Sequence, residues 1–138
     1  QENDAEAARL YQTAAEHGHI GAQVNLGRMY RDGRGVTQDD AEAVRWYRTA
    51  ADRGHPFAQF NLALMYQLGS GITQSNVTAH MWYVLAADGL SGDKREVAMA
   101  AHMRAVESLG RIEQRMGPTE IAEAQQLARE WKPLAQEP

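Results

Sequence analysis

An internal repeat of 36 residues constrains the fold of this chain more than any other feature of its sequence. Residues 3–38 and 39–74 align without a gap and are identical at 21 of 36 positions. A third copy begins at residue 75, keeps the first half of the pattern to about residue 92 and then diverges. Repeats of roughly 20 to 50 residues indicate solenoids, in which each unit buries its apolar face against its neighbours. We therefore predict one repeat domain over residues 1–138.

Two helices are predicted in each unit, because apolar residues recur twice at helical spacing. The first helix carries a stripe at i, i+3, i+4, i+7 and i+8, which is typical of an amphipathic helix buried on one side. In the three units this stripe comprises Ala7, Leu10, Tyr11, Ala14 and Ala15, then Ala43, Trp46, Tyr47, Ala50 and Ala51, then Ala79, Trp82, Tyr83, Ala86 and Ala87. The second helix repeats Ala22, Leu26, Met29 and Tyr30 as Ala58, Leu62, Met65 and Tyr66.

The starts of the first helices carry capping signals. Asn3, Asp39 and Ser75 stand where an N-cap is needed, and Glu6 and Glu42 follow three residues later in the spacing of a capping box. These signals predict that the first helices begin directly after residues 3, 39 and 75.

The connections between helices are also marked. Gly18 and Gly54 are expected to be left-handed C-terminal caps of the first helices. His19 and His55 then hold cap positions before the second helices, and Pro56 takes a first helical position, where its missing N–H costs nothing. A glycine-rich return loop follows each second helix and contains Gly33, Gly35, Gly69 and Gly71.

The end of the chain departs from the repeat. Residues 93–116 are predicted to form one long helix, and Pro118 opens a final helix that ends at Lys132-Pro133. Its apolar stripe is expected to place Trp131 in the core. The predicted units are 3–38, 39–74, a divergent 75–116, and a capping helix over 117–133. The apolar positions expected to face the core are Val97, Ala98, Ala101, Ala105, Leu109, Ile112 and Met116, then Ile121, Ala124, Leu127, Ala128 and Trp131.

Composition narrows the classes of ligand. The formal net charge is -4 at pH 7, from 18 acidic and 14 basic residues that are interleaved along the chain. Nucleic acid is not expected as a partner, because phosphate binding needs a basic stripe. No apolar run approaches the roughly 18 residues of a membrane-spanning helix, so direct membrane insertion is not expected. Cysteine is absent, which excludes disulfides and thiolate chemistry.

The repeated pattern A-x-x-W/L-Y-x-x-A-A-x-x-G-H-x-x-A-Q-x-x-L-x-x-M-Y-x-x-G-x-G-V/I resembles the Sel-one-like repeat, a relative of the tetratricopeptide repeat. The resemblance covers residues 3 to about 92, and RMGPTEIAEAQQLAREW near the end is similar to the closing segment of bacterial members. It implies an all-α, right-handed superhelix of helical hairpins. It also implies an adaptor with no activity of its own and favours a bacterial envelope or secreted location over the cytoplasm.

No catalytic, cofactor or metal site is predicted. Although His17 and His19 are close in sequence, His19 and His55 hold equivalent cap positions, and no carboxylates converge on them by spacing. His80 and His102 are expected on the surface or between packed helices. The loops around Gly33 and Gly69 lack the strand that precedes a phosphate loop. No serine can be matched with a base and an orienting acid.

Binding is therefore assigned to the polar side of the first helices, which are expected to line the concave face by analogy with related repeats. In the third unit the same positions become Met81, Val84 and Leu85, which are either covered by the long helix or form an apolar anchor pocket. The candidates in the first two units are Glu6, Arg9, Gln12, Thr13, Glu42, Arg45, Arg48 and Thr49.

Several alternatives remain at this level. The expected function is a protein-interaction scaffold for a protein or peptide, and the alternatives are an inhibitor or immunity protein for one enzyme and a glycan-binding or hydrolytic envelope protein. No helix is predicted before residue 3, so Leu10 and Tyr11 are expected to be exposed at an end of the stack that no other helix covers. Residues 1–138 are therefore expected either to continue a longer array or to self-associate at this end.

Overall fold

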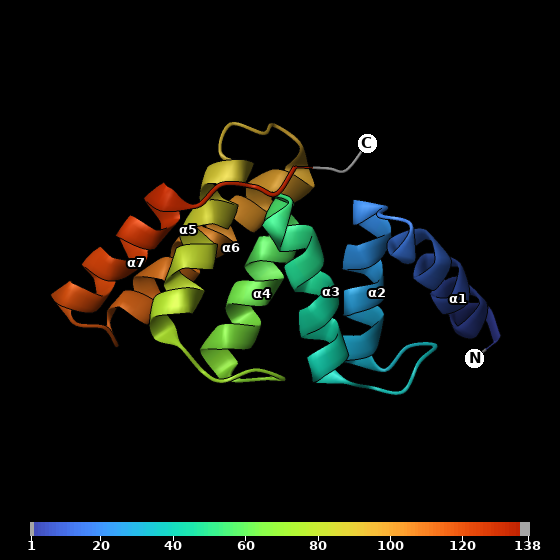
Figure 1. Cartoon of the computed structure of the whole chain (residues 1–138). Coiled ribbons are helices and arrows are strands. Elements are labelled where there is room, and N and C mark those ends of the chain that lie inside the picture. Colours follow the sequence, from blue (N-terminus) through green and yellow to red (C-terminus); the bar gives the residue numbers. More distant parts are fainter. Residues whose placement is uncertain (1, 136–138) are drawn as a thin grey trace.

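The computed structural model describes residues 2–135, and all regular structure in that range is α-helical. The helices are α1 (Glu2–Glu16), α2 (Ile20–Asp32), α3 (Asp40–Asp52), α4 (Pro56–Leu68), α5 (Asn76–Leu90), α6 (Glu96–Glu113) and α7 (Pro118–Glu130). Consecutive helices from α1 to α6 pack against one another, and α7 packs on α5 (Figure 1). The predicted all-α repeat solenoid is confirmed. No helix within the described range is long and apolar enough to cross a membrane.

The repeated alanines and aromatic residues form the core. Tyr47 and Tyr83 are completely buried at equivalent positions of α3 and α5, and Trp46 and Trp82 beside them are nearly so. Alanine at the remaining stripe positions allows two helices to approach closely, and the rings fill the space between successive pairs. Burying one such ring contributes on the order of 1.5–3 kcal/mol. Periodicity in the sequence therefore identified the residues that hold the stack together.

A buried glutamine in each of the first two units was missed by the sequence analysis. Gln23 donates its side-chain N–H to the carbonyl of Ala15 at 3.1 Å, and Gln59 donates to Ala51 at 3.2 Å. Each glutamine joins a second helix to the last turn of the first helix before it. A buried amide is costly to leave without a partner, so this bond fixes how the two helices align along their lengths.

Most of the predicted caps are confirmed. The side chains of His19 and His55 accept N–H bonds from Ala22 and Ala58 at the starts of α2 and α4. Gly18 and Gly54 have φ of 88° and 93°, as expected of left-handed caps. The side chains of Asp39 and Ser75 cap α3 and α5.

Two predictions about the helix starts are wrong. Asn3 lies inside α1, which begins at Glu2, and so does not cap it. The capping box at Glu42 is only half formed, because the Asp39 N–H already donates to the carbonyl of Tyr30 at 2.9 Å. Glu42 pairs with Arg45 instead.

The C-terminal helices are shorter and less regular than predicted. The long helix begins at Glu96 and ends at Glu113, rather than running from 93 to 116. Val97 and Leu127, both predicted to face the core, are 70% and 39% exposed. Each lies at the edge of its stripe, where a small rotation of the helix decides the direction of the side chain. Trp131 is half-buried, and its ring meets the edge of Trp82 at 6.0 Å.

After α7 the chain turns back along the stack. The red segment in Figure 1 runs from α7 across the end of α5 toward α3, and the N–H of Leu134 donates to the carbonyl of Asp52 at 2.7 Å. The α3–α4 turn lies beneath it, because a Cβ added at Gly54 would stand 3.7 Å from Pro133 and 3.8 Å from Trp131. The tail thus ties the last helix to the middle of the stack.

We expect the histidine cap of α4 to make stability depend on pH. Burial lowers the pKa of His55 below its ordinary value of 6.5, and its Nδ1 must stay unprotonated to accept the Ala58 N–H at 3.3 Å. The unfolded chain then binds the proton more readily, so this contribution is present above pH 6.5 and is lost as the pH falls toward the lowered pKa. Urea unfolding between about pH 7.5 and 5.5 should show it.

The His55→Asn variant is the control, because asparagine caps a helix without titrating. Its free energy of unfolding should fall less over the same pH range than that of the wild type, while the other histidines contribute equally to both proteins. Parallel pH profiles for the two proteins would contradict a neutral His55.

Candidate partner-binding groove

One hollow of the molecule lies on the second helices of the units. It has a volume of about 410 Å³ and is formed by α2, α4 and α6. A smaller hollow of about 280 Å³ continues it and shares Arg28, Phe57 and Val97. We call the two together the groove, and its central part is lined by Arg28, Arg31, Phe57, Phe60, Asn61, Val97, Ala100, Ala101 and Arg104.

Equivalent positions of three helices build the groove. Its lining residues occupy the second, fifth, sixth and ninth positions of the helices, a spacing that places them on one helical face. These are Gly21, Val24, Asn25 and Arg28 on α2, then Phe57, Phe60 and Asn61 on α4, then Val97, Ala100, Ala101 and Arg104 on α6. Arg31 adds one further residue from α2.

The sequence does contain a signal for the groove. The first two units agree at the buried positions of the second helix, as at Leu26 and Leu62. They differ at several groove positions, where Gly21, Val24 and Arg28 become Phe57, Phe60 and Leu64, although Asn25 and Asn61 agree. Packing demands the same residue in each unit, whereas a surface that binds one ligand need not repeat. Differences between aligned units therefore mark this face.

Aromatic rings held by neighbouring helices form the floor. Phe60 of α4 meets the edge of Tyr83 at 5.6 Å, and Phe57 lies 5.9 Å from the ring of His55. Both phenylalanines remain half-buried rather than covered. The Arg104 guanidinium stands 5.5 Å from the Phe60 ring centre, in a cation–π arrangement that positions its charge above the floor.

The charge of the groove is positive. Arg28, Arg31 and Arg104 line it, and no carboxylate does among the residues that the structure describes. Arg31 pairs with Asp32 at 3.1 Å. In the described part of the chain, Arg28 and Arg104 make no ion pair. Two of the three guanidinium groups are therefore available to a ligand.

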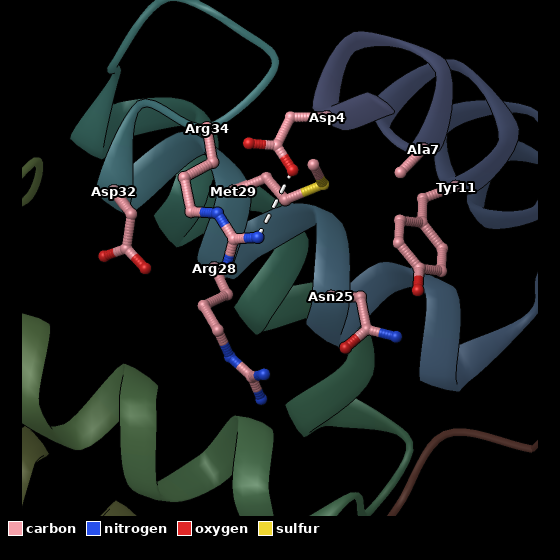
Figure 2. Close-up of a pocket in the computed structure, with 8 residues that line it drawn as sticks. All are labelled: Asp4, Ala7, Tyr11, Asn25, Arg28, Met29, Asp32 and Arg34. Atoms are coloured by element: carbon pink, nitrogen blue, oxygen red, sulfur yellow. Dashed lines mark hydrogen bonds and ion pairs between the residues drawn. The ribbon is translucent and has the colours of Figure 1, made fainter. Parts of the chain in front are cut away.

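The carboxylates that share a hollow with Arg28 are already engaged. A third hollow of about 180 Å³ between α1 and α2 holds Asp4 and Asp32 beside Arg28. Asp4 pairs with Arg34 at 3.3 Å, while Arg28 extends away from both residues (Figure 2). Tyr47 offers no counter-charge either, because burial raises the pKa of its phenol and keeps it neutral. Its hydroxyl is buried and has no partner within residues 2–135.

The residues predicted to bind a partner lie elsewhere. We expected the first helices to line the concave face, but the groove is formed by the second helices and includes none of the eleven candidates. Glu6 and Arg9 border a different hollow, an open one beside Gly35. Helical periodicity marks the buried face of each helix, but it does not tell which helix of a pair lines a hollow. A binding role for these residues stays a prediction.

Most of the polar candidates are engaged within the chain. Arg9 pairs with Glu6, and Arg45 pairs with Glu42 at 3.0 Å while lying 4.5 Å from the Trp46 ring centre. The remaining contacts are Gln12 with Glu16, Arg48 with the Tyr66 hydroxyl, and the hydroxyls of Thr13 and Thr49 with backbone carbonyls.

The apolar candidates of the third unit are partly covered. Met81 and Leu85 pack against a core cluster that includes Ile112 of α6 and Ala124 of α7. Val84 is half-buried. Of the two explanations offered for these apolar positions, the geometry favours coverage by the C-terminal helices.

The histidines serve as caps and helix contacts. His80 is buried and contacts Glu113 of α6 at 2.8 Å, and His102 contacts the carbonyl of Ala87 at 3.0 Å. No group of three or more possible metal ligands occurs among residues 2–135. The glycines of the return loops adopt positive φ and shape turns between helices.

Comparisons with known proteins agree with the repeat fold. The family model of the Sel1 repeat matches residues 1–19, 20–55 and 56–89. A protective antigen of uropathogenic Escherichia coli with an SLR fold superposes with a TM-score of 0.80 at 26% identity over 92% of this chain. A Sel1 repeat protein from Oxalobacter formigenes superposes with a TM-score of 0.61 at 30% identity over 90%. This chain spans 25% and 54% of their lengths. A comparison with curated proteins gave no match.

Proposed function

Because this chain belongs to the Sel1 repeat family, we propose that it is a scaffold that holds a segment of a partner protein in the groove of α2, α4 and α6. Sel1 repeat proteins are generally protein-interaction scaffolds, and their fold is typically non-catalytic. The observation that carries the proposal is one continuous hollow, lined by equivalent positions of three successive units.

The chemistry of the groove suits a polypeptide segment. Half-buried phenylalanine rings offer apolar anchor sites of the kind that dominate binding energy at interfaces. Asn25 and Asn61 are equivalent in the first two units, and their side chains form no hydrogen bond within the described residues. An amide both donates and accepts, so it can bond to the N–H and the carbonyl of a ligand backbone.

The polar face of α1 and α3 is the rival surface. Arg9 and Arg45 already pair with residues of their own helices, and Arg48 contacts Tyr66 of α4, so a partner would have to displace those contacts. Exposed pairs of this kind are weak, at about 0.2–1 kcal/mol. The choice between the two faces is therefore best made by substitution.

A displayed library of short random peptides should yield sequences that bind the chain, and their affinity can be measured by fluorescence anisotropy. Phe57→Ala with Asn61→Ala should weaken binding about tenfold or more, because truncating a central anchor costs on the order of 1–2 kcal/mol or more. Arg9→Glu with Arg45→Glu should change it by less than about twofold. Circular dichroism should show that both variants keep the helical fold.

The opposite pattern, with binding lost only in the α1 and α3 variant, would place the ligand on the first helices. Selected peptides that are insensitive to both pairs of substitutions, or a library that yields no binder, would contradict a peptide-binding groove.

A further inference from the structure

We infer that the groove selects an acidic segment, in which one or more carboxylates flank an apolar side chain. The inference rests on the proposed function, since it names the chemistry of the partner held in that groove. It concerns this chain's own arginines, since Arg28 and Arg104 hold the ninth positions of α2 and α6, where α4 has Leu64.

The distribution of charge favours an anionic ligand. The whole chain has 18 acidic and 14 basic residues. Three of the arginines nevertheless gather in one hollow that no carboxylate of the described residues lines. The excess of acid elsewhere repels an acidic segment from other surfaces, so the field directs it to the groove.

The arginines stand on two sides of the aromatic floor. Arg28 and Arg31 are one turn apart on α2, and Arg104 is on α6, while Phe57 and Phe60 of α4 lie between these helices. An apolar side chain that rests on the phenylalanines would bring its neighbouring carboxylates toward these guanidinium groups. Arginine binds a carboxylate through two parallel N–H bonds, which makes the recognition directional as well as electrostatic.

The same features favour a peptide over a nucleic acid as the ligand of the groove. A phosphate backbone carries regularly spaced charge and needs a continuous basic stripe. Here the three arginines of the groove lie in one hollow, and the chain as a whole is acidic. A short segment with few carboxylates and an apolar anchor fits this surface better than a polyanion does.

Selection from the displayed library tests the preference for acidic segments without assuming a particular peptide sequence. Peptides selected by the wild-type chain should be enriched in Asp and Glu beside apolar residues, relative to the unselected library. Replacing their acidic residues by Asn or Gln should weaken binding about tenfold or more, and the remaining affinity should depend little on salt.

Substitution of the arginines gives the matched experiment. Arg28→Gln, Arg31→Gln and Arg104→Gln together should abolish the preference for acidic peptides. Lys94→Gln, Arg115→Gln and Arg129→Gln remove the same charge from exposed residues outside the groove, and should leave the preference unchanged. Thermal unfolding followed by circular dichroism should show that both triple variants fold.

The outcomes separate the inference from the function on which it rests. If Phe57→Ala with Asn61→Ala weakens binding but the selected peptides carry no acidic excess, the groove binds peptides and the inference is wrong. If binding ignores those two substitutions, the proposed function fails as well. The choice of an acidic peptide would also be overturned if the two triple variants lost the same amount of peptide affinity, or if single-stranded DNA displaced the peptide.

Discussion

Replacing Gly71 by alanine should lower the free energy of unfolding by about 2–5 kcal/mol, the sum of a backbone term and a steric term. Gly71 has φ of 72°, a conformation that L side chains rarely adopt. A Cβ there would also lie 2.5 Å from the carbonyl carbon and oxygen of Asp40. These atoms belong to the first turn of α3, so relief would require the return loop and the helix to separate. Urea denaturation measures the loss.

The Gly18→Ala variant separates the two causes. Gly18 also has a positive φ of 88°, but a Cβ there would meet nothing within 4 Å. It should therefore lose only the backbone term of about 1–2 kcal/mol. Equal losses at the two sites would show that the contact between the loop and α3 contributes nothing.

Gly35 repeats this contact and shows why the loop glycines recur. A Cβ at Gly35 would stand 2.1 Å from the carbonyl oxygen of Asp4 in α1. In each of the first two units the return loop thus lies on the start of its own first helix, which brings the end of the unit back to its beginning. The loops were predicted from their glycines, but this close approach was not.

The sequence predicted the features that packing repeats in every unit. Ala43, Tyr47 and Leu62 recur in register because each unit buries the same stripe, and His19 and His55 recur because each second helix needs a cap. Such positions are constrained by local geometry and by one neighbouring helix. When a sequence contains internal repeats, aligning its units with one another identifies such positions.

The groove was not predicted, because it depends on how successive pairs are oriented. The α6 helix starts four residues later than the 36-residue period would place it, since α2 and α4 begin at residues 20 and 56 and α6 at residue 96. Counting from this later start aligns Arg104 with Arg28 and Val97 with Phe57. That shift arises because both α5 and the connection after it are longer than their counterparts in the second unit. These lengths alone do not reveal which face of α6 lines a hollow.

The C-terminal tail provides the second large expected effect. Trp131→Ala should lower the free energy of unfolding by about 2–4 kcal/mol, which is somewhat below the range for a fully buried tryptophan because the ring is half-buried. The substitution removes the contact of the ring with Trp82 and its cover over Gly54. It also frees the segment whose Leu134 N–H bonds to Asp52 at the end of α3.

The matched control for Trp131 is Leu127→Ala on α7, the helix that Trp131 follows, at a position where the apolar side chain is 39% exposed. It should cost less than about 1 kcal/mol, because little apolar surface returns to water.

Hydrogen exchange tests which helices the Trp131 substitution affects. If the tail fastens α7 to the stack, Trp131→Ala should speed exchange in α7 more than in α2. Equal costs for the two variants, or uniform acceleration across all helices, would mean that α7 is held by its contact with α5 alone.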